Sequence, residues 1–465
     1  SVPKTLVLAA ALALVAAAAA LAAPPKVDPA LHDQALELLK KGIAFRTVTP
    51  GDQVAPYAAY LKDVLVKAGY RPEDVKIEAV AGSATLTARY PGADPKKKPI
   101  IVIDHMDVVE AKAADWTRDP FTPVVENGYV YGRGSYDDKF DVSIVVTVLS
   151  KLKRAGWKPG RDVILALSGD EETAGRTAAH LAQQLKGAEM VLNGDGGGGL
   201  LSEDGKPVVY ALEGAEKTYA DFSVTVTNPG GHSSRPGKTN AIYQLAQDLD
   251  RLAAYQFPPM RNEFTDAFFK ASAPNTAGPA GEAMKRYVAN PGDAEAVAAL
   301  SALPEYVGQL RTTCVATQIS GGHAPNALPQ KVTANINCRI FPGTPTEAVR
   351  QTLVKVLADP EAKVVPSEDN PGVDAGPSPL RPDVLAAVTK AVHASHPGVP
   401  IVPSMAAGAS DSIFYRAQGM PAYNLGGLFM KSSDDFAHGL NERAPLAAID
   451  ADLVHWESLL RDLAK

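Results

Sequence analysis

Short apolar runs alternate with longer amphipathic segments over most of the chain, a pattern that predicts a sheet covered by helices. Continuous apolar runs at 99–109 and 161–172 predict buried strands that end in polar residues, and 190–197 predicts a shorter strand that leads into a glycine-rich turn. Residues 140–156 have the apolar spacing of a helix. We therefore expect an α/β domain over about 28–213.

The pattern then changes to alternating strands with half-exposed faces. Such a strand is predicted at 219–228, a helix follows at 240–255, and a further strand lies at 332–341. These elements predict an inserted two-layer α+β domain, here called the lid, over about 215–342. Within it, an Ala-rich helical insert is expected at about 258–304.

Helix–strand alternation resumes over 344–465, so both ends of the chain are expected to build one large domain. The predicted fold is α/β, with a central mixed sheet flanked by helices and interrupted by the lid. The 465 residues are 46% apolar and 21% charged, which is typical of a globular protein with a large core. The formal net charge of −6 argues against a nucleic-acid partner.

The first residues depart from this composition. Lys4 is the only charge ahead of a Leu/Ala/Val run at 6–23, which ends in small residues before Pro24. We expect residues 1–23 to be a signal peptide, and the protein to be exported to the periplasm or the extracellular space. The alternative is a retained membrane anchor, since the run approaches the length of a spanning helix. After cleavage, no membrane span is expected.

The two cysteines, Cys314 and Cys338, lie in stretches predicted to be strands. An exported protein could join them in a disulfide, but two buried thiols on neighbouring strands fit the sequence equally well. Glycines at 196–199 lack the spacing and the Lys–Ser/Thr pair of a phosphate-binding loop.

Acidic residues and histidines follow several of the predicted strands, where ligand sites gather in α/β sheets. Two carboxylates next to each other beside a buried strand are unfavourable unless a cation or a shared proton compensates them. Two metal sites that share one carboxylate need about five nitrogen and oxygen ligands. The candidates, together with the carboxylates beside them, are His105, Asp107, Asp137, Asp138, Glu171, Glu172, Asp195 and His438.

These residues lie within longer motifs that occur in a definite order: HMDVV, GRGSYDDK, SGDEETAG, GGHSSRPG, GGHAPNALP and a late histidine. In them the chain resembles the zinc-dependent aminoacylase and carboxypeptidase superfamily, which includes glutamate carboxypeptidase, succinyl-diaminopimelate desuccinylase and the secreted N-acyl-amino-acid hydrolases. The likeness covers nearly all of the chain after the predicted signal peptide.

The resemblance implies a role for each candidate. Two Zn²⁺ ions are the implied cofactors, with Co²⁺ or Mn²⁺ as alternatives, and two metals can lower the pKa of a shared water that acts as the nucleophile. Glu171 is then the general base, and Asp107 orients a histidine ligand. The peptide bond after the bridging aspartate is implied to be cis. The implied ligands are His105 and Asp195 on one metal, Glu172 and His438 on the other, and Asp137 on both.

The lid motifs imply residues that contact the substrate. His232 corresponds to the family's donor to the developing oxyanion, often supplied across a dimer interface, although taken alone it fits a loop residue. Asn326 and Arg339 match residues that hold the substrate's carbonyl and carboxylate groups. Gly408 lies in a segment that resembles a substrate-binding turn, but Ala409 replaces the usual hydroxyl residue.

The predicted function is therefore that of an exported di-metal hydrolase, which cleaves an amide or peptide bond next to a free carboxylate in a small molecule or short peptide. It would be a carboxypeptidase or an N-acyl-amino-acid hydrolase. An aminopeptidase or dipeptidase of the same superfamily is the alternative, and a non-catalytic exported binding protein is a more remote one. A homodimer through the lid is expected, but the helical insert at 258–304 could instead cover the lid edge and leave a monomer.

Overall fold

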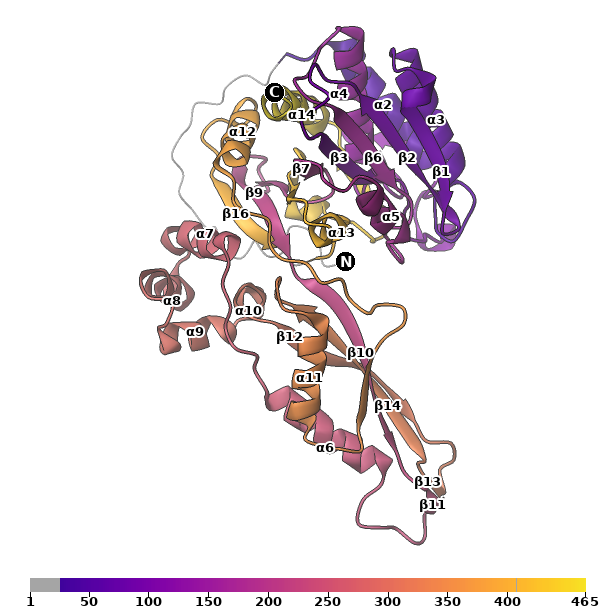
Figure 1. Cartoon of the computed structure of the whole chain (residues 1–465), viewed down its shortest axis with the longest axis vertical. Helices are drawn as coiled ribbons and strands as arrows, with labels where there is room; N and C mark the ends of the chain where they lie inside the picture. The colour runs from indigo at the N-terminus through magenta and orange to yellow at the C-terminus, as the bar shows by residue number, and fades with distance from the viewer. Residues whose placement is uncertain (1–25, 407) are drawn as a thin grey trace.

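The computed structural model describes residues 26–465 except residue 407, so the predicted signal peptide at 1–23 lies outside the described residues. The chain forms a large domain and a narrower, elongated second domain that extends away from it (Figure 1). The described residues begin and end in the large domain, and the second domain is inserted between two segments of it. In this part of the chain, no helix combines the length and apolar character needed to cross a membrane.

The predicted apolar runs form the centre of the large domain's mixed sheet. Strand β3 is buried at every position and lies between β6 and β7, parallel to both. The outer strands β1 and β2 pair in antiparallel fashion, and β16 pairs with β9 outside the main strand order. Within the described residues this sheet has ten strands: β1 (Val75–Val80), β2 (Ser83–Tyr90), β3 (Ile100–His105), β6 (Val163–Ser168), β7 (Met190–Asn193), β8 (Gly198–Leu201), β9 (Pro207–Glu216), β16 (Ile401–Ala406), β17 (Ala422–Asn424) and β18 (Phe429–Lys431).

Helices flank this sheet, as predicted, and contribute to one extensive apolar core. The first of them begins at Pro29, where the Asp28 side chain accepts a hydrogen bond of 3.0 Å from the backbone nitrogen of Ala30. The helix predicted at 140–156 is buried over most of its length, which explains its apolar character all round. The helices of the large domain are α2 (Pro29–Ala44), α3 (Val54–Lys67), α4 (Lys139–Arg154), α5 (Arg176–Gln184), α12 (Pro382–His393), α13 (Ser412–Ala417) and α14 (Ala448–Leu463).

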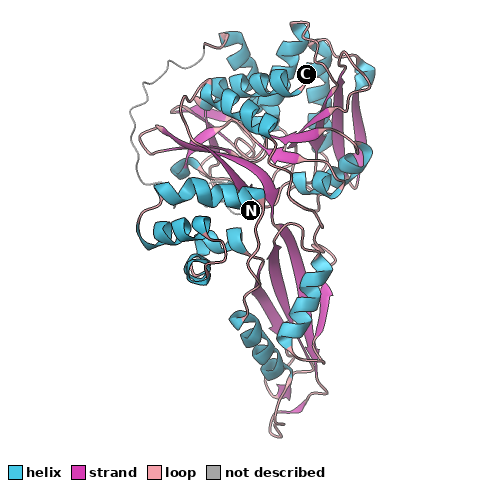
Figure 2. Ribbon diagram, turned by 60° about the vertical axis from the view of Figure 1, so that its left-hand side comes forward, coloured by secondary structure: helices cyan, strands magenta, loops and turns pink. Residues whose placement is uncertain are grey.

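The second domain is a sheet with helices packed on one side (Figure 2). Its strand order is β12 (Thr313–Gly321), β14 (Lys331–Ile340), β10 (Thr218–Thr227) and β15 (Lys363–Pro366), and its helices are α6 (Ala241–Ala254) and α11 (Thr346–Leu357). The predicted boundary at 342 is too early, because β15 pairs with β10 and because Val349 and Leu353 of α11 lie in the core of this domain. Residues 346–366 belong to the lid rather than to the large domain.

The helical insert is also placed differently from the prediction. Its helices form a core with Val209 of β9 and Val402 of β16, so they pack on the large domain rather than on the lid edge. Apolar side chains of the sheet strands complete this core. The sequence alone could not show which domain the helices of the insert cover. These helices are α7 (Glu263–Ser272), α8 (Gly278–Ala289), α9 (Ala294–Ser301) and α10 (Pro304–Leu310).

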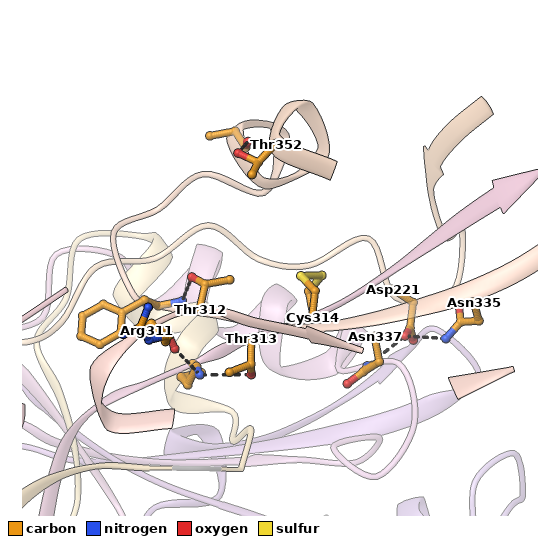
Figure 3. Close-up of a disulfide and its surroundings, with 12 residues drawn as sticks. Asp221, Arg311, Thr312, Thr313, Cys314, Asn335, Asn337 and Thr352 are labelled. Carbon is orange, nitrogen blue, oxygen red and sulfur yellow. Dashed lines mark hydrogen bonds between the residues drawn. A yellow bond between two sulfur atoms is a disulfide. The ribbon is translucent and has the colours of Figure 1, made fainter. Parts of the chain in front are cut away.

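Cys314 and Cys338 face each other in the antiparallel register of β12 and β14 and form a disulfide (Figure 3). Of the two possibilities left open by the sequence, the structure thus has the bridge. To its right in this view, the Asp221 carboxylate accepts hydrogen bonds from the side-chain amides of Asn335 and Asn337, at 3.0 and 2.9 Å. The face of β10 and β14 opposite the helices is therefore polar at this point, as the alternating pattern of these strands predicts.

Candidate active site

Three parallel strands deliver site residues to one edge of the large sheet. His105 is the last residue of β3, Glu171 and Glu172 follow the end of β6, and Asp195 follows the end of β7. Because the carboxyl ends of parallel neighbours lie at the same edge, side chains far apart in sequence come together there. Asp137 reaches this edge from the loop between β5 (Tyr129–Tyr131) and α4.

The fifth candidate ligand, His438, lies in the loop between β18 and the short strand β19 (Arg443–Pro445), which pairs with β5. The third strand of that small sheet is β4 (Val124–Glu126). The pairing of β19 with β5 holds the loop of His438 beside the loop of Asp137.

The ligand candidates form two groups that share Asp137. In the first, His105 Nε2 lies 3.1 Å from Asp137 Oδ1 and 3.8 Å from Asp195 Oδ2. In the second, His438 Nε2 lies 2.8 Å from Glu172 Oε1 and 3.4 Å from Asp137 Oδ2. Within each group, the ligand atoms lie within 4.8 Å of one another. The two oxygens of Asp137 thus face two different imidazoles, the arrangement that a bridging carboxylate needs.

Hydrogen bonds around the two groups orient their members. His105 Nδ1 donates to the carbonyl oxygen of Asp107 at 3.0 Å, which leaves the lone pair of Nε2 directed at the group. The Asp107 carboxylate accepts from the backbone nitrogens of Glu171 and Glu172, at 3.1 and 3.0 Å. Asp107 therefore positions the histidine and the two glutamates together.

The next aspartate along the chain does not face the group. Asp138 Oδ2 accepts a hydrogen bond of 2.9 Å from the backbone nitrogen of His105, and Asp138 is fully buried. The peptide bond between Asp137 and Asp138 is cis, as the family resemblance implies. Asp138 thus holds the end of β3 against the start of α4.

The electrostatics of this cluster call for cations. Burial raises the pKa of Glu171 well above its usual range, and the nearby carboxylates of Glu172 and Asp195 raise it further, while His105 lowers it. Burial alone would lower the pKa of His438, but hydrogen bonds to the carboxylates of Asp137 and Glu172 raise it to about 9. Burial is thus the main cause of the first effect, and the surplus of carboxylates over imidazoles adds to it and causes the second. Oxygen and imidazole donors in two groups suit a pair of divalent cations.

The residues predicted in the lid are not brought to this cluster within one chain. His232 is exposed on β11 (Gly231–His232), which pairs with β13 (Ala327–Leu328) at the far tip of the lid (Figure 1). Asn326 lies at the same tip, where its carbonyl oxygen accepts from the backbone nitrogen of Ser233 at 3.0 Å. Arg339 lies elsewhere, half-buried on β14, with its guanidinium 4.4 Å from the centre of the Tyr219 ring.

The turn that contains Gly408 is fastened to the large domain. Glu216 accepts from the backbone nitrogen and the hydroxyl of Ser410, at 3.0 and 2.7 Å. The neighbouring Asp411 accepts from the hydroxyl of Ser168 at the end of β6, and its charge is among those that raise the pKa of Glu171. The turn of Gly408 therefore lies beside the metal-ligand groups.

Sequence reasoning missed three buried carboxylates that support this site: Glu216, Asp411 and Glu442. Asp411 lies three residues after Gly408, and Glu442 lies four residues after His438. No sequence pattern identifies either of them, or Glu216, as part of the site. Glu216 accepts hydrogen bonds from the turn that contains Gly408, and Asp411 joins this turn to the end of β6. Glu442 accepts hydrogen bonds from the loop of Asp137. The signal that reveals them is their burial together with the hydrogen bonds that they accept from neighbouring groups.

Comparison with known proteins agrees with this geometry. The family model "Peptidase family M20/M25/M40" matches residues 101–462. The chain is 27% identical over 439 residues to the N-fatty-acyl-amino acid synthase/hydrolase PM20D1 of Xenopus tropicalis, which covers 90% of this chain and 83% of that protein. It is 28% identical over 344 residues to carboxypeptidase S of Saccharomyces cerevisiae, covering 67% of this chain and 58% of that one.

Among solved structures, an M20 family metallo-carboxypeptidase from Sulfolobus solfataricus, Sso-CP2, superposes with a TM-score of 0.70 at 19% identity and covers 93% of this chain and 99% of its own. This similarity supports a large domain interrupted by an inserted lid domain. The match to the family model extends over most of the chain and includes every residue of the two metal-ligand groups. The chain therefore belongs to peptidase family M20/M25/M40, and it is an enzyme of the metallopeptidase type that hydrolyses amide bonds.

Proposed function

We propose that this chain is a di-metal hydrolase that cleaves an amide or peptide bond next to a free carboxylate, as a carboxypeptidase or an N-acyl-amino-acid hydrolase. The observation that carries the proposal is the position of Asp137, with one oxygen toward His105 and the other toward His438. The names of two relatives, an N-fatty-acyl-amino acid synthase/hydrolase and a carboxypeptidase, agree with such substrates.

The residues of the site fit two divalent metal ions, and Zn²⁺ is the proposed pair, with Co²⁺ or Mn²⁺ as alternatives. Asp137 would contribute one oxygen to each ion. Bound metal ions would polarise the scissile carbonyl and make a water molecule more acidic. The other ligands would be His105 and Asp195 for one ion, and Glu172 and His438 for the other.

Glu171 is the proposed general base. Its Oε2 lies 3.8 Å from His105 Nε2, and its side chain is 15% exposed, so it lies beside the two groups and remains accessible to substrate. Glu171 takes a proton from the attacking water and passes it to the leaving nitrogen. Asp107, which accepts from the backbone nitrogen of Glu171, keeps this carboxylate in place.

The substrate carboxylate is proposed to bind Arg339, whose planar guanidinium can donate two parallel hydrogen bonds to a carboxylate. Asn326 would bind the substrate carbonyl, and backbone groups near Gly408 would contact the substrate. His232 would donate to the developing oxyanion. Because His232 and Asn326 lie at the lid tip, a second copy of the chain is the proposed source of these two residues, and the enzyme is proposed to act as a homodimer.

Export to the periplasm or the extracellular space is a further part of the proposal. The Cys314–Cys338 disulfide supports it, because disulfides persist in oxidising compartments and are rare in the reducing cytosol. The predicted leader at 1–23 agrees with this location.

The decisive experiment compares two glutamine variants of neighbouring glutamates. Glu171→Gln should lower kcat at least about a hundredfold on N-acyl amino acids while both metal ions stay bound, because only the proton acceptor is lost. Glu172→Gln should lose one metal ion, because it removes a ligand. Metal content by mass spectrometry and kcat on a panel of N-acyl amino acids and free dipeptides provide the readout.

Two results would contradict the proposal. Unchanged turnover in Glu171→Gln would reject this residue as the base. A preference for peptides with a free amine over N-acylated substrates would favour an aminopeptidase or dipeptidase instead.

A further inference from the structure

Glu442 is a fully buried glutamate to which the proposed reaction assigns no role. Its Oε2 accepts hydrogen bonds from Arg133 Nη1 at 2.8 Å and from the backbone nitrogen of Gly134 at 3.1 Å. Its Oε1 accepts from the backbone nitrogens of Tyr136 and Asp137, at 2.9 and 3.0 Å. Three backbone amides of one loop thus converge on a single carboxylate, in the manner of an anion-binding nest.

The same residue belongs to the loop that carries His438. Its own carbonyl oxygen accepts from the backbone nitrogen of Gly132 at 3.0 Å, so main chain and side chain both join the two loops. His438 and Asn441 have positive φ values of 60° and 54°, in the left-handed region where these two residue types are found more often than other residues with a side chain. The loop between them and Glu442 is therefore a tight turn.

The other three candidate ligands are placed in a different way. His105 is the last residue of β3 and pairs with Ser168 of β6. The backbone nitrogen of Glu172 donates to the Asp107 carboxylate at 3.0 Å, and that of Asp195 donates to Asn193 Oδ1 at 2.9 Å, so side chains next to the strand ends fix these two backbones. Asp137 and His438 lie on loops outside that sheet. Their separation, 3.4 Å between Oδ2 and Nε2, therefore depends on how the two loops are joined.

We propose that Glu442 is a positioning residue that sets the affinity of the metal position formed by Asp137, Glu172 and His438. Two of these three ligands lie on the loops that Glu442 joins, whereas the group of His105 and Asp195 shares only Asp137 with those loops. Loss of the Glu442 contacts therefore weakens one metal position much more than the other. This inference rests on the proposed di-metal function, which it makes more specific.

The test is a metal titration of the whole chain after removal of bound metal by a chelator, with Co²⁺ as the probe and its absorption spectrum as the readout. In Glu442→Gln the side chain keeps its size, but an NH₂ group replaces one of the two accepting oxygens and confronts backbone donors. Its affinity for one Co²⁺ should fall by about 10- to 100-fold, as for other residues that orient metal ligands, while the second affinity stays near the wild-type value. Saturating metal should then restore kcat without a change in KM.

Asp248→Asn is the matched control. Asp248 is a similarly buried carboxylate that pairs with an arginine, Arg251, at 2.5 Å, but it lies on α6 of the lid and not on the loops that carry metal ligands. The control should destabilise the fold without altering either Co²⁺ affinity. Unchanged Co²⁺ affinities in Glu442→Gln, or an equal weakening in Asp248→Asn, would overturn the inference. A wild-type chain that binds two ions but cleaves no N-acyl amino acid or peptide would overturn the proposed function alone.

Discussion

Glu171 and Glu172 are neighbours in the chain, yet their side chains meet different partners. Glu172 Oε1 lies 2.8 Å from His438 Nε2, whereas Glu171 Oε2 lies 3.8 Å from His105 Nε2. Their backbone nitrogens both donate to the Asp107 carboxylate, which holds the pair in one orientation. One conformation of three residues thus provides a candidate ligand and a candidate base, and this explains why two adjacent carboxylates are needed.

His455 on α14 shows how burial alone changes protonation. It is buried, its Nε2 donates to the carbonyl oxygen of Leu425 at 2.8 Å, and burial lowers its pKa to about 4. Between pH 4 and 6.5 the unfolded chain therefore binds a proton at this residue that the folded chain does not. Since stability rises with pH wherever the unfolded state binds more protons, His455 stabilises the fold increasingly over this window.

Replacing this residue tests the sign of that effect. Glutamine in His455→Gln can still donate to Leu425 but does not titrate, so the stability advantage of the wild type over the variant should grow by up to about 3 kcal/mol from pH 4 to pH 6.5. Urea unfolding at several pH values measures it. Comparison with the variant removes the opposing contribution of nearby Asp452, whose pKa burial raises to about 8. A constant difference across the window would mean that His455 is protonated in the folded state.

At the scale of elements, the lid sheet ends in an exposed edge strand, β12. Strand β12 pairs with β14 on one side, and most of its length is exposed, including Val315 at 57% and Ile319 at 58%. Such a strand has few apolar contacts to hold it. The disulfide between Cys314 and Cys338 links the start of β12 covalently to β14. Exposed apolar side chains on an edge strand also suit a contact with another chain, which agrees with the proposed homodimer.

The double variant Cys314→Ser/Cys338→Ser should destabilise the lid. The bridge closes a loop with a sequence separation of 24 residues, and chain entropy gives about 3 kcal/mol for a loop of that size. Denaturant unfolding of the wild type, with and without a reductant, should reproduce this loss, whereas the reductant should not affect the double variant. Equal stability of all three forms would show that strand pairing alone holds β12.

At the scale of the molecule, two regions predicted to act together lie far apart. The metal-ligand groups are at the sheet edge of the large domain, and His232 and Asn326 are at the opposite tip of the lid (Figure 1). Tyr243 on α6 is 60% exposed and lies on the same domain as the exposed apolar residues of β12. A lid with this surface and with site residues at its tip fits an enzyme whose site is completed by a second copy.

Mixing two inactive variants tests that arrangement. His232→Ala lacks the proposed oxyanion donor, and Glu171→Gln lacks the proposed base. In a mixed dimer one site would contain both intact residues, so random exchange of subunits should restore about a quarter of wild-type activity. Activity of the mixture, with each variant alone as the control and sedimentation to count subunits, gives the answer. No recovery in a mixture shown to exchange, or full activity of a wild-type monomer, would contradict a donor supplied by the partner.

Much of the candidate site could be named from the sequence because its proposed ligands are histidines and carboxylates in motifs that follow apolar strands. The same reasoning failed for 346–366 and for the helical insert, because an amphipathic helix shows which face is buried but not which domain covers it. Glu442 was not identified from the sequence, because the burial of a single glutamate and its hydrogen-bond partners become visible only in the folded chain.

The amino-acid sequence was enough to predict the α/β class and the inserted second domain, which follow from local periodicity. It also named the candidate chelating residues, through their chemistry and the family motifs in which they lie. The folded structure was needed to show that Asp137 lies between two histidines, that Cys314 faces Cys338, and that His232 is remote from the metal-ligand groups of its own chain. The physical reason is that distances between residues far apart in sequence depend on strand order and loop contacts, which are properties of the packed chain as a whole.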